Sequence, residues 1–293
     1  MAFVFGANFF SAFRGFATSQ AFEELLAKED TTIEQVLEEE DVIQETRNNN
    51  AKLMEFLTEE RIENMLLYIT EEPPEDADHN RAYKYPFQVS EMLSCEPPSV
   101  MEKITDSEEL LERVFKFFVS DSALNLTLAG YVSKCVISLL SRSRNIVSSH
   151  ILQENLYGKA MVSHVYSKSI AELLGKVLSM EDPGVEPVFI PQRLEILEAV
   201  VNSLGTSEDY DVITNATLLL VDFVYKNEGV NGWNILIARL LSREILTQMF
   251  GFLSSTNVTT VKGVVSVLNA VFNHGNFNEI LQYDLEKLLA GET

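Results

Sequence analysis

Apolar side chains recur along most of this chain at the three- to four-residue spacing of an amphipathic α-helix. From Thr18 to Gly291, the alternation typical of a β-strand never persists beyond a few residues. Gly, Ser, Asn and Pro gather between the apolar segments, where helices end and new ones are capped. The pattern therefore predicts an all-helical protein whose helices are joined by short connections.

The first predicted helices carry recognisable start and stop signals. Thr32 and Gln35 can form a capping box that opens a short helix, and Asp41 is the expected N-cap of a second one. Along that second helix, the helically spaced residues from Val42 are Ile43, Thr46, Asn50, Leu53, Met54 and Leu57. A third helix is predicted over Glu59 to Thr70, because the following Pro73-Pro74 pair cannot continue it.

The stretch from Glu75 to Pro86 is charged and then aromatic, and it is predicted to be a loop. A new helix is expected at Phe87, with Pro86 in its first turn. Beyond Asp106-Ser107, the segment Leu110 to Phe118 is apolar over more than half of the helical wheel. Such a helix has to pack on two sides, which places it inside a stack.

Eight further apolar-striped helices are predicted after that segment. They are Leu124 to Leu140, Ile146 to Leu156, Ile170 to Met180, Leu194 to Leu204, Val212 to Tyr225, Ile235 to Leu241, Ile245 to Leu253 and Val258 to Phe272, with a loop from Asp182 to Pro191. Helix pairs that cannot bury both faces alone favour an irregular α-solenoid of HEAT/armadillo-like helical repeats, although no strict period is visible. A globular helical bundle is the structural alternative.

Residues 1–17 form a Phe-rich N-terminal segment, and residues 18–293 are predicted to be a single helical-repeat domain. The segment carries no charge before Arg14, so it lacks the leading positive charge of a signal peptide. With Asn8 as N-cap, its phenylalanines share one arc of a helix. A terminal helix that caps the stack is favoured over an in-plane membrane anchor, and no membrane span is expected.

The charge of the chain is strongly acidic, with a formal net charge of -22. Such a balance disfavours nucleic acid and anionic membrane surfaces as partners. The charge is also unevenly spread, because residues 19–78 hold nineteen acidic and four basic residues, whereas residues 123–180 hold two and six. A polarised solenoid can offer both poles to a complementary partner, although the basic residues can equally serve only to solubilise outer helix faces.

No catalytic or cofactor motif is visible. The phosphate-binding GxxxxGK[ST] loop, the dinucleotide-binding GxGxxG turn and the GxSxG nucleophile elbow are all missing from the sequence. The four histidines lack metal-site spacing, and the acidic runs consist of adjacent residues that point in different directions on a helix. The chain is therefore expected to be no enzyme and to hold no metal or cofactor, and its two separated cysteines suit a reducing compartment.

The N-terminal half resembles a known family. The blocks that carry the resemblance are, in order, residues 30–45 (DTTIEQVLEEEDVIQE) with 50–57 (NAKLMEFL), then 67–74 (LYITEEPP), then 83–86 (YKYP) with 90–96 (SEMLSCE), and finally 124–134. Together they are similar to the SAPS domain, found in regulatory subunits of the type 6 serine/threonine protein phosphatase. After Asn125 this chain has Leu126-Thr127, where that family commonly has a proline after the asparagine, so the local turn can differ.

The resemblance implies a non-catalytic regulatory or scaffold subunit that binds the phosphatase catalytic subunit and directs it to substrates, with a further adaptor subunit left open. The expected contact residues are Tyr83, Lys84, Tyr85, Pro86, Glu91 and Lys134, since an aromatic, positive, proline-bordered loop has the composition of interface anchors. The tyrosines can equally pin the loop to the stack. The competing function is a helical-repeat adaptor for peptides or transport cargo without a phosphatase. The family implies cytoplasmic residence and leaves nuclear residence open.

Overall fold

The computed structural model describes residues 20–180, 189–227 and 235–274, and within these ranges every regular element is a helix. The Phe-rich segment 1–17 and most of the expected loop from Asp182 to Pro191 lie outside the described residues. The chain divides into two compact units. The first unit contains residues 1–117 and 125–147, and the second contains residues 118–124 and 148–293.

The first unit is built from short helices followed by the long helix α9. Its elements are α2 (Ile33–Glu38), α3 (Val42–Arg47), α4 (Ala51–Phe56), α5 (Glu59–Thr70), the π-helix η1 (Asn80–Lys84), α6 (Tyr85–Ser94), α7 (Pro98–Asp106), α8 (Glu108–Lys116) and α9 (Leu126–Arg142). Helix α10 (Arg144–Leu152) begins in the first unit and ends in the second.

The second unit contains the remaining helices. They are α11 (Leu156–Ser163), α12 (Lys168–Leu178), α13 (Ile190–Thr206), α14 (Tyr210–Lys226), α15 (Ile235–Leu240), α16 (Arg243–Phe252) and α17 (Val258–Phe272). Helix α17 has the bounds that the apolar pattern predicts. None of the described helices is both long enough and apolar enough to cross a membrane.

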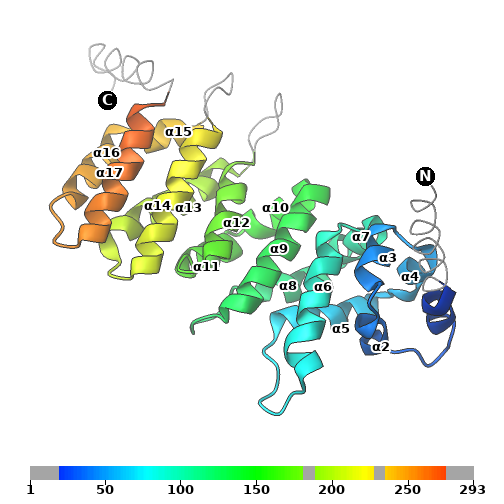
Figure 1. The fold of residues 1–293 in the computed structure, drawn as a ribbon. Helices are drawn as coiled ribbons and strands as arrows, with labels where there is room; N and C mark the ends of the chain where they lie inside the picture. The colour runs from blue at the N-terminus through cyan, green and yellow to red at the C-terminus, as the bar shows by residue number, and fades with distance from the viewer. Residues whose placement is uncertain (1–19, 181–188, 228–234, 275–293) are drawn as a thin grey trace, which may run out of the picture. The chain divides into compact units, whose positions relative to one another are not determined.

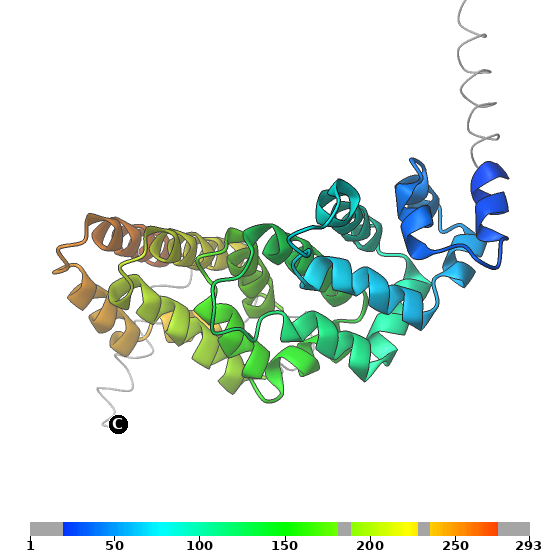
Figure 2. The ribbon, with the colours of Figure 1, turned by 90° about the horizontal axis from the view of Figure 1, so that it is seen from below.

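Helix pairs stack within each unit. In the first unit, α5 packs on α6, α8 and α9, and α6 also lies beside α9 (Figure 1). In the second unit, α11, α13 and α16 form one layer, and α12, α14 and α17 form the other (Figure 2). Each helix thereby buries its apolar face against its own pair and the neighbouring pair. The predicted fold class, an all-α solenoid of HEAT/armadillo-like repeats, is confirmed.

Side-chain caps explain many of the helix starts. The capping box predicted for Thr32 and Gln35 is present, with Thr32 Oγ1 accepting from the Gln35 amide and Gln35 Oε1 accepting from the Thr32 amide. Asn125 and Asn257 cap α9 and α17 in the same way, through bonds from the amides that follow them. Asp41 occupies the predicted N-cap position of α3, although its side chain makes no capping bond.

The prediction of a single helix between Val42 and Leu57 is wrong. The chain forms α3 and α4 instead, with a turn between them at Asn48 to Asn50. Asn49 has a φ of 52°, in the left-handed region that asparagine tolerates better than most residues. Asn50 Oδ1 then accepts from the amides of Lys52 and Leu53 and opens α4. The apolar spacing continues across this break, which is why the pattern conceals it.

The loop expected over Glu75 to Pro86 is wrong in its second half. From Asn80 the chain already forms η1, and the Tyr85 amide donates to the Asn80 carbonyl five residues earlier. Pro86 has no N–H to donate, so this wider turn leads into α6 without the loss of a bond at that position. Helical structure therefore begins at Asn80 and not at Phe87.

Two helices were not anticipated. Helix α7 starts directly at Pro98, which suits a first helical turn because its missing N–H would have no partner there. The helix that was expected to run from Ile146 to Leu156 ends at Leu152, and Asn155, with a φ of 53°, is the N-cap of α11. Both breaks interrupt the backbone without interrupting the sequence of apolar residues.

Candidate partner-binding surface

Helix α6 is almost enclosed by its neighbours. Helices α2, α3, α5 and α9 pack against it, and its exposed side chains are confined to one narrow strip. Tyr83 of η1 and Phe87 are the two large residues of this strip, with 67% and 48% of their surfaces exposed. Glu91 and Ser94 continue it at helical spacing. Exposed aromatic side chains on a rigid interior helix are typical of protein interfaces.

The strip is held from beneath by Glu38 at the end of α2. Its backbone carbonyl accepts from Lys84 Nζ at 2.8 Å, and its carboxylate oxygen Oε1 accepts from the Tyr85 hydroxyl at 2.7 Å. Asn80 Nδ2 donates to the same carboxylate oxygen at 3.1 Å. Burial and the bond to Glu38 raise the pKa of Tyr85 to about 12. Three bonds from η1 and α6 to one residue fix the π-helical turn in place.

A second carboxylate anchor lies alongside. Tyr68 of α5 donates to Glu34, and its ring lies 5.3 Å from the ring of Tyr85. Burial and the bond to Glu34 raise the pKa of Tyr68 above its usual range. Burial opposes the ionisation of Glu34, but the hydrogen bonds it accepts, led by that from Tyr68, outweigh this and lower its pKa. The carboxylates of α2 therefore tie α2, α5 and α6 together.

An ion pair joins α6 to α9 on the exposed side. Lys134 Nζ lies 3.0 Å from Glu91 Oε1, and Ser141 and Arg142 both donate to Glu96 further along. Residue numbers rise together on the two helices, so α6 and α9 run parallel. Tyr131 precedes Lys134 by about one turn of α9, as Phe87 precedes Glu91 by about one turn of α6. We call the set Tyr83, Phe87, Glu91, Tyr131 and Lys134 the α6–α9 surface.

The predicted contact residues divide into two groups. Tyr83, Glu91 and Lys134 face solvent on the α6–α9 surface, whereas Tyr85 and Pro86 are buried beneath it. The idea that the tyrosines pin the loop therefore holds for Tyr85. Tyr83 instead points outward and lies against His79, with ring centroids 5.3 Å apart and the rings tilted by 42°.

Phe87 was not among the predicted residues. Its position four residues after Tyr83 and four before Glu91 is the signal that could have identified it, because these three residues fall on one helix face once Asn80 to Ser94 is known to be helical. The expectation of a loop up to Pro86 concealed this spacing.

An acidic connection borders the surface. Between α5 and η1, residues 71–78 carry five exposed carboxylates and no basic side chain; we call this segment the acidic loop, and its acidic residues are Glu71, Glu72, Glu75, Asp76 and Asp78. Asp78 Oδ1 accepts from the Arg81 amide at 2.8 Å, which orders the junction with η1. The α6–α9 surface therefore begins where the most acidic loop of the first unit ends.

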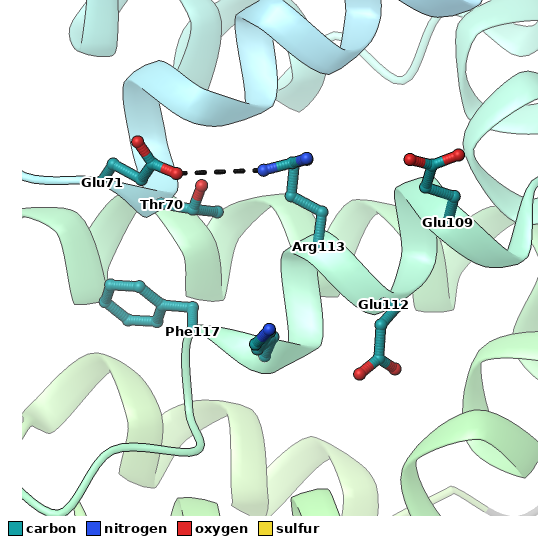
Figure 3. A pocket seen from close by; sticks show the side chains of 7 residues that line it. Thr70, Glu71, Glu109, Glu112, Arg113 and Phe117 are labelled. Carbon is teal, nitrogen blue, oxygen red and sulfur yellow. Dashed lines mark ion pairs between the residues drawn. The ribbon is translucent and has the colours of Figure 1, made fainter.

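A pocket of about 370 Å³ lies between the end of α5 and α8 (Figure 3). Its lining residues are Thr70, Glu71, Glu109, Glu112, Arg113, Lys116 and Phe117. Arg113 bridges Glu63 and Glu71, and the longer of these pairs, to Glu71, is 3.9 Å. The lining contains no serine, cysteine or histidine, and the hydroxyl of Thr70 donates to the Leu66 carbonyl at 2.9 Å. Its carboxylates extend the acidic character of the loop.

The described residues include His164 and both cysteines of the chain. His164 is buried, with Nε2 3.0 Å from the Phe118 carbonyl and Nδ1 3.1 Å from the Tyr166 hydroxyl. Burial lowers its pKa. Cys95 and Cys135 are both free thiols. Across the described ranges, no three His, Cys, Asp or Glu side chains are placed to hold a metal ion.

Comparison with known proteins shows a consistent relationship, although no family model matches the chain. It is 28% identical over 268 residues to serine/threonine-protein phosphatase 6 regulatory subunit 3-A of Xenopus laevis, covering 86% of this chain and 31% of that protein. Regulatory subunit 1 of Mus musculus is 30% identical over 211 residues, covering 71% and 25%. Extragenic suppressor of kinetochore protein 1 of Schizosaccharomyces pombe is 24% identical over 276 residues, covering 88% and 32%.

The resemblance to regulatory subunits of the type 6 phosphatase is thereby confirmed over most of the chain. The chain spans about a third of the length of the first of these relatives. Among solved structures, an engineered protein is similar with a TM-score of 0.45 and 14% identity, covering 86% of this chain and 97% of that one.

Proposed function

From its similarity to phosphatase 6 regulatory subunits, we propose that this protein is a non-catalytic regulatory or scaffold subunit that binds a serine/threonine protein phosphatase catalytic subunit and directs it to substrates. The observation that carries the proposal is the extent of the match, which covers 86% of this chain against regulatory subunit 3-A. A stack of helix pairs suits this role because it offers an extended, rigid docking surface.

The α6–α9 surface is the proposed contact. It presents two exposed aromatic side chains, Tyr83 and Phe87, on helices that are fixed from beneath by Glu38. Large aromatic anchors on a preorganised support lose little conformational freedom when they bind. Glu91 and Lys134 add a polar rim whose charges are already paired.

The absence of a catalytic role is part of the proposal. Within the described residues, the pocket beside α8 has no serine, cysteine or histidine in its lining, and His164 is engaged with a carbonyl and a hydroxyl. The phosphatase chemistry would belong to the partner. We further propose cytoplasmic residence, which the two free thiols suit, with nuclear residence in addition where the partner is nuclear.

The proposal is tested by affinity capture of the chain from a gentle, low-salt lysate, followed by binding of the purified chain to a purified type 6 catalytic subunit. Direct binding, with no phosphopeptide hydrolysis by the chain alone, supports it. Failure to bind the catalytic subunit, together with recovery of peptide or transport cargo, would instead establish the adaptor function. Hydrolysis by the purified chain alone would make it an enzyme and refute the proposal.

A further inference from the structure

The structure shows that the two cations of the predicted contact region are engaged in contacts within the first unit. From the sequence, Arg81 and Lys84 make the segment before α6 look positive. In the folded protein the Arg81 guanidinium lies over the Tyr68 ring, 4.8 Å from its centroid, and Lys84 Nζ donates to the Glu38 carbonyl. Both cations are therefore used within the first unit and are not free to meet a partner's carboxylates.

The carboxylates of the acidic loop, in contrast to these cations, are exposed. Glu72, Glu75 and Asp76 are exposed, and no described basic side chain forms an ion pair with them. The Glu71 carboxylate has the long 3.9 Å contact with Arg113, and the Glu71 carbonyl accepts from Arg81 at 3.5 Å. No ion pair offsets these three carboxylates, so the electrostatic potential at the acidic loop is negative at neutral pH.

The exposed apolar surface lies next to this charge. Tyr83 follows Asp78 after one turn of η1, and Phe87 is one helical turn further along. The surface therefore has an apolar centre and one acidic edge. A binding face of this kind selects for a partner that places an apolar side chain against the aromatics and basic side chains against the edge.

We infer that the α6–α9 surface docks a basic-rimmed apolar patch of a protein partner, in which lysine or arginine side chains meet the acidic loop and an apolar side chain meets Tyr83 and Phe87. This inference rests on the proposed function and assigns that chemistry to the contact face of the phosphatase catalytic subunit. It also explains why the cations Lys84 and Lys134 are held in internal bonds.

Charge disfavours the other occupants. A second copy that docked through the same surface would bring two acidic edges together, because a two-fold interface uses the same patch on both chains. Nucleic acid and anionic lipid would be repelled by the same carboxylates. A basic protein surface gains from them in both the rate and the orientation of encounter.

The experiment compares two triple variants with equal changes in net charge. The test variant is Glu72→Lys, Glu75→Lys and Asp76→Lys in the acidic loop, and the control is Glu29→Lys, Asp30→Lys and Glu55→Lys, which are exposed elsewhere in the first unit. Binding to the purified catalytic subunit is measured by calorimetry at about 50 and about 300 mM salt, where screening differs strongly. Thermal melting checks that each variant is folded.

The test variant is expected to bind the catalytic subunit at least about ten-fold more weakly than the control at low salt, and to lose less affinity as salt rises. If the wild type binds but the two triple variants bind equally, the inference is wrong and the proposed function survives. If the wild type does not bind at all, both are refuted. Should the lysine variant melt early, Glu72→Gln, Glu75→Gln and Asp76→Asn give the same comparison without charge reversal.

Sedimentation of the purified chain tests whether a second copy of this chain occupies the surface. A monomer supports the inference, and a dimer that Phe87→Ala dissociates would overturn it, because the surface would then belong to a second copy of this chain.

Discussion

The ammonium nitrogen of Lys134 lies 3.0 Å from a carboxylate oxygen of Glu91, a residue 43 positions earlier in the chain. That separation falls in the range of about 40–47 residues for one HEAT or armadillo repeat. Equivalent outward positions of α6 and α9 are therefore joined by this pair. The period that the sequence conceals becomes visible as a contact between neighbouring repeats.

The first prediction concerns the exposed aromatics. Phe87→Ala with Tyr83→Ala is expected to weaken binding to the phosphatase catalytic subunit by about ten-fold or more, because anchors of this type dominate interface energies. Thermal stability should change little, since both side chains are exposed. Tyr225→Ala, an aromatic 52% exposed on α14, is the control. Calorimetric titration of each variant decides the matter, and equal affinities for the two would count against the α6–α9 surface.

The second prediction concerns the ion pair between α6 and α9. Lys134→Glu should weaken binding through repulsion within the surface, and the exchange Glu91→Lys with Lys134→Glu should restore the pair and part of the affinity. The cost in unfolding free energy should stay below about 1 kcal/mol because the pair is largely solvated. Binding and urea unfolding are measured for the wild type and both variants. A double variant no better than Lys134→Glu would show that the pair has no role in shaping the contact.

The third prediction concerns the support beneath the surface. Tyr85→Phe removes the buried hydroxyl that donates to Glu38 at 2.7 Å and leaves that exposed carboxylate with one protein donor fewer. The expected loss is about 1–3 kcal/mol of unfolding free energy, as for a hydrogen bond to a charged group. Urea denaturation measures it. Unchanged stability would mean that Asn80 and Lys84 hold η1 without Tyr85.

The fourth prediction is a pH dependence. Burial lowers the pKa of His164 below 6.5, so the unfolded chain binds a proton at this residue more readily than the folded one. The stability that the neutral ring contributes is full above that pH and is lost as pH falls towards the lower folded pKa. Unfolding free energies between about pH 7 and about pH 5 should therefore decline less steeply in His164→Gln. Parallel curves for the variant and the wild type would exclude His164 as the source.

The fifth prediction concerns the close approach of α14 and α17. A Cβ added to Gly263 would clash with Thr217 Oγ1, so Gly263→Ala should destabilise the protein by about 1–3 kcal/mol through overpacking. Gly175→Ala is the matched control, because its Cβ would meet Leu219 at an ordinary 3.8 Å. Adding Thr217→Ala to Gly263→Ala should recover part of the loss. Thermal melts of the four proteins test this, and an equal effect of both glycine substitutions would contradict it.

Local sequence was sufficient for many element boundaries. Helices α5 and α17 start and stop where prolines, asparagines and apolar spacing indicate, and the Thr32–Gln35 capping box forms as expected. The failures share one cause. At Asn48 to Asn50 and at Asn80 to Lys84 the apolar spacing does not register the change in backbone, because one left-handed residue or one wide turn leaves the neighbouring side chains in place.

By itself, the sequence determined the helical class, the capping signals and the resemblance to phosphatase regulatory subunits, since these depend on residues close together in the chain. The tertiary structure alone decided which side chains the candidate surface presents. In the sequence, Lys84 looks like a free cation, but its ammonium donates to the carbonyl of Glu38, 46 residues away. Tyr85 looks like a surface anchor, but its ring is buried and its hydroxyl donates to the carboxylate of the same Glu38. Side-chain direction depends on such distant partners, so Phe87 was identified as an exposed residue of this surface only in the folded chain.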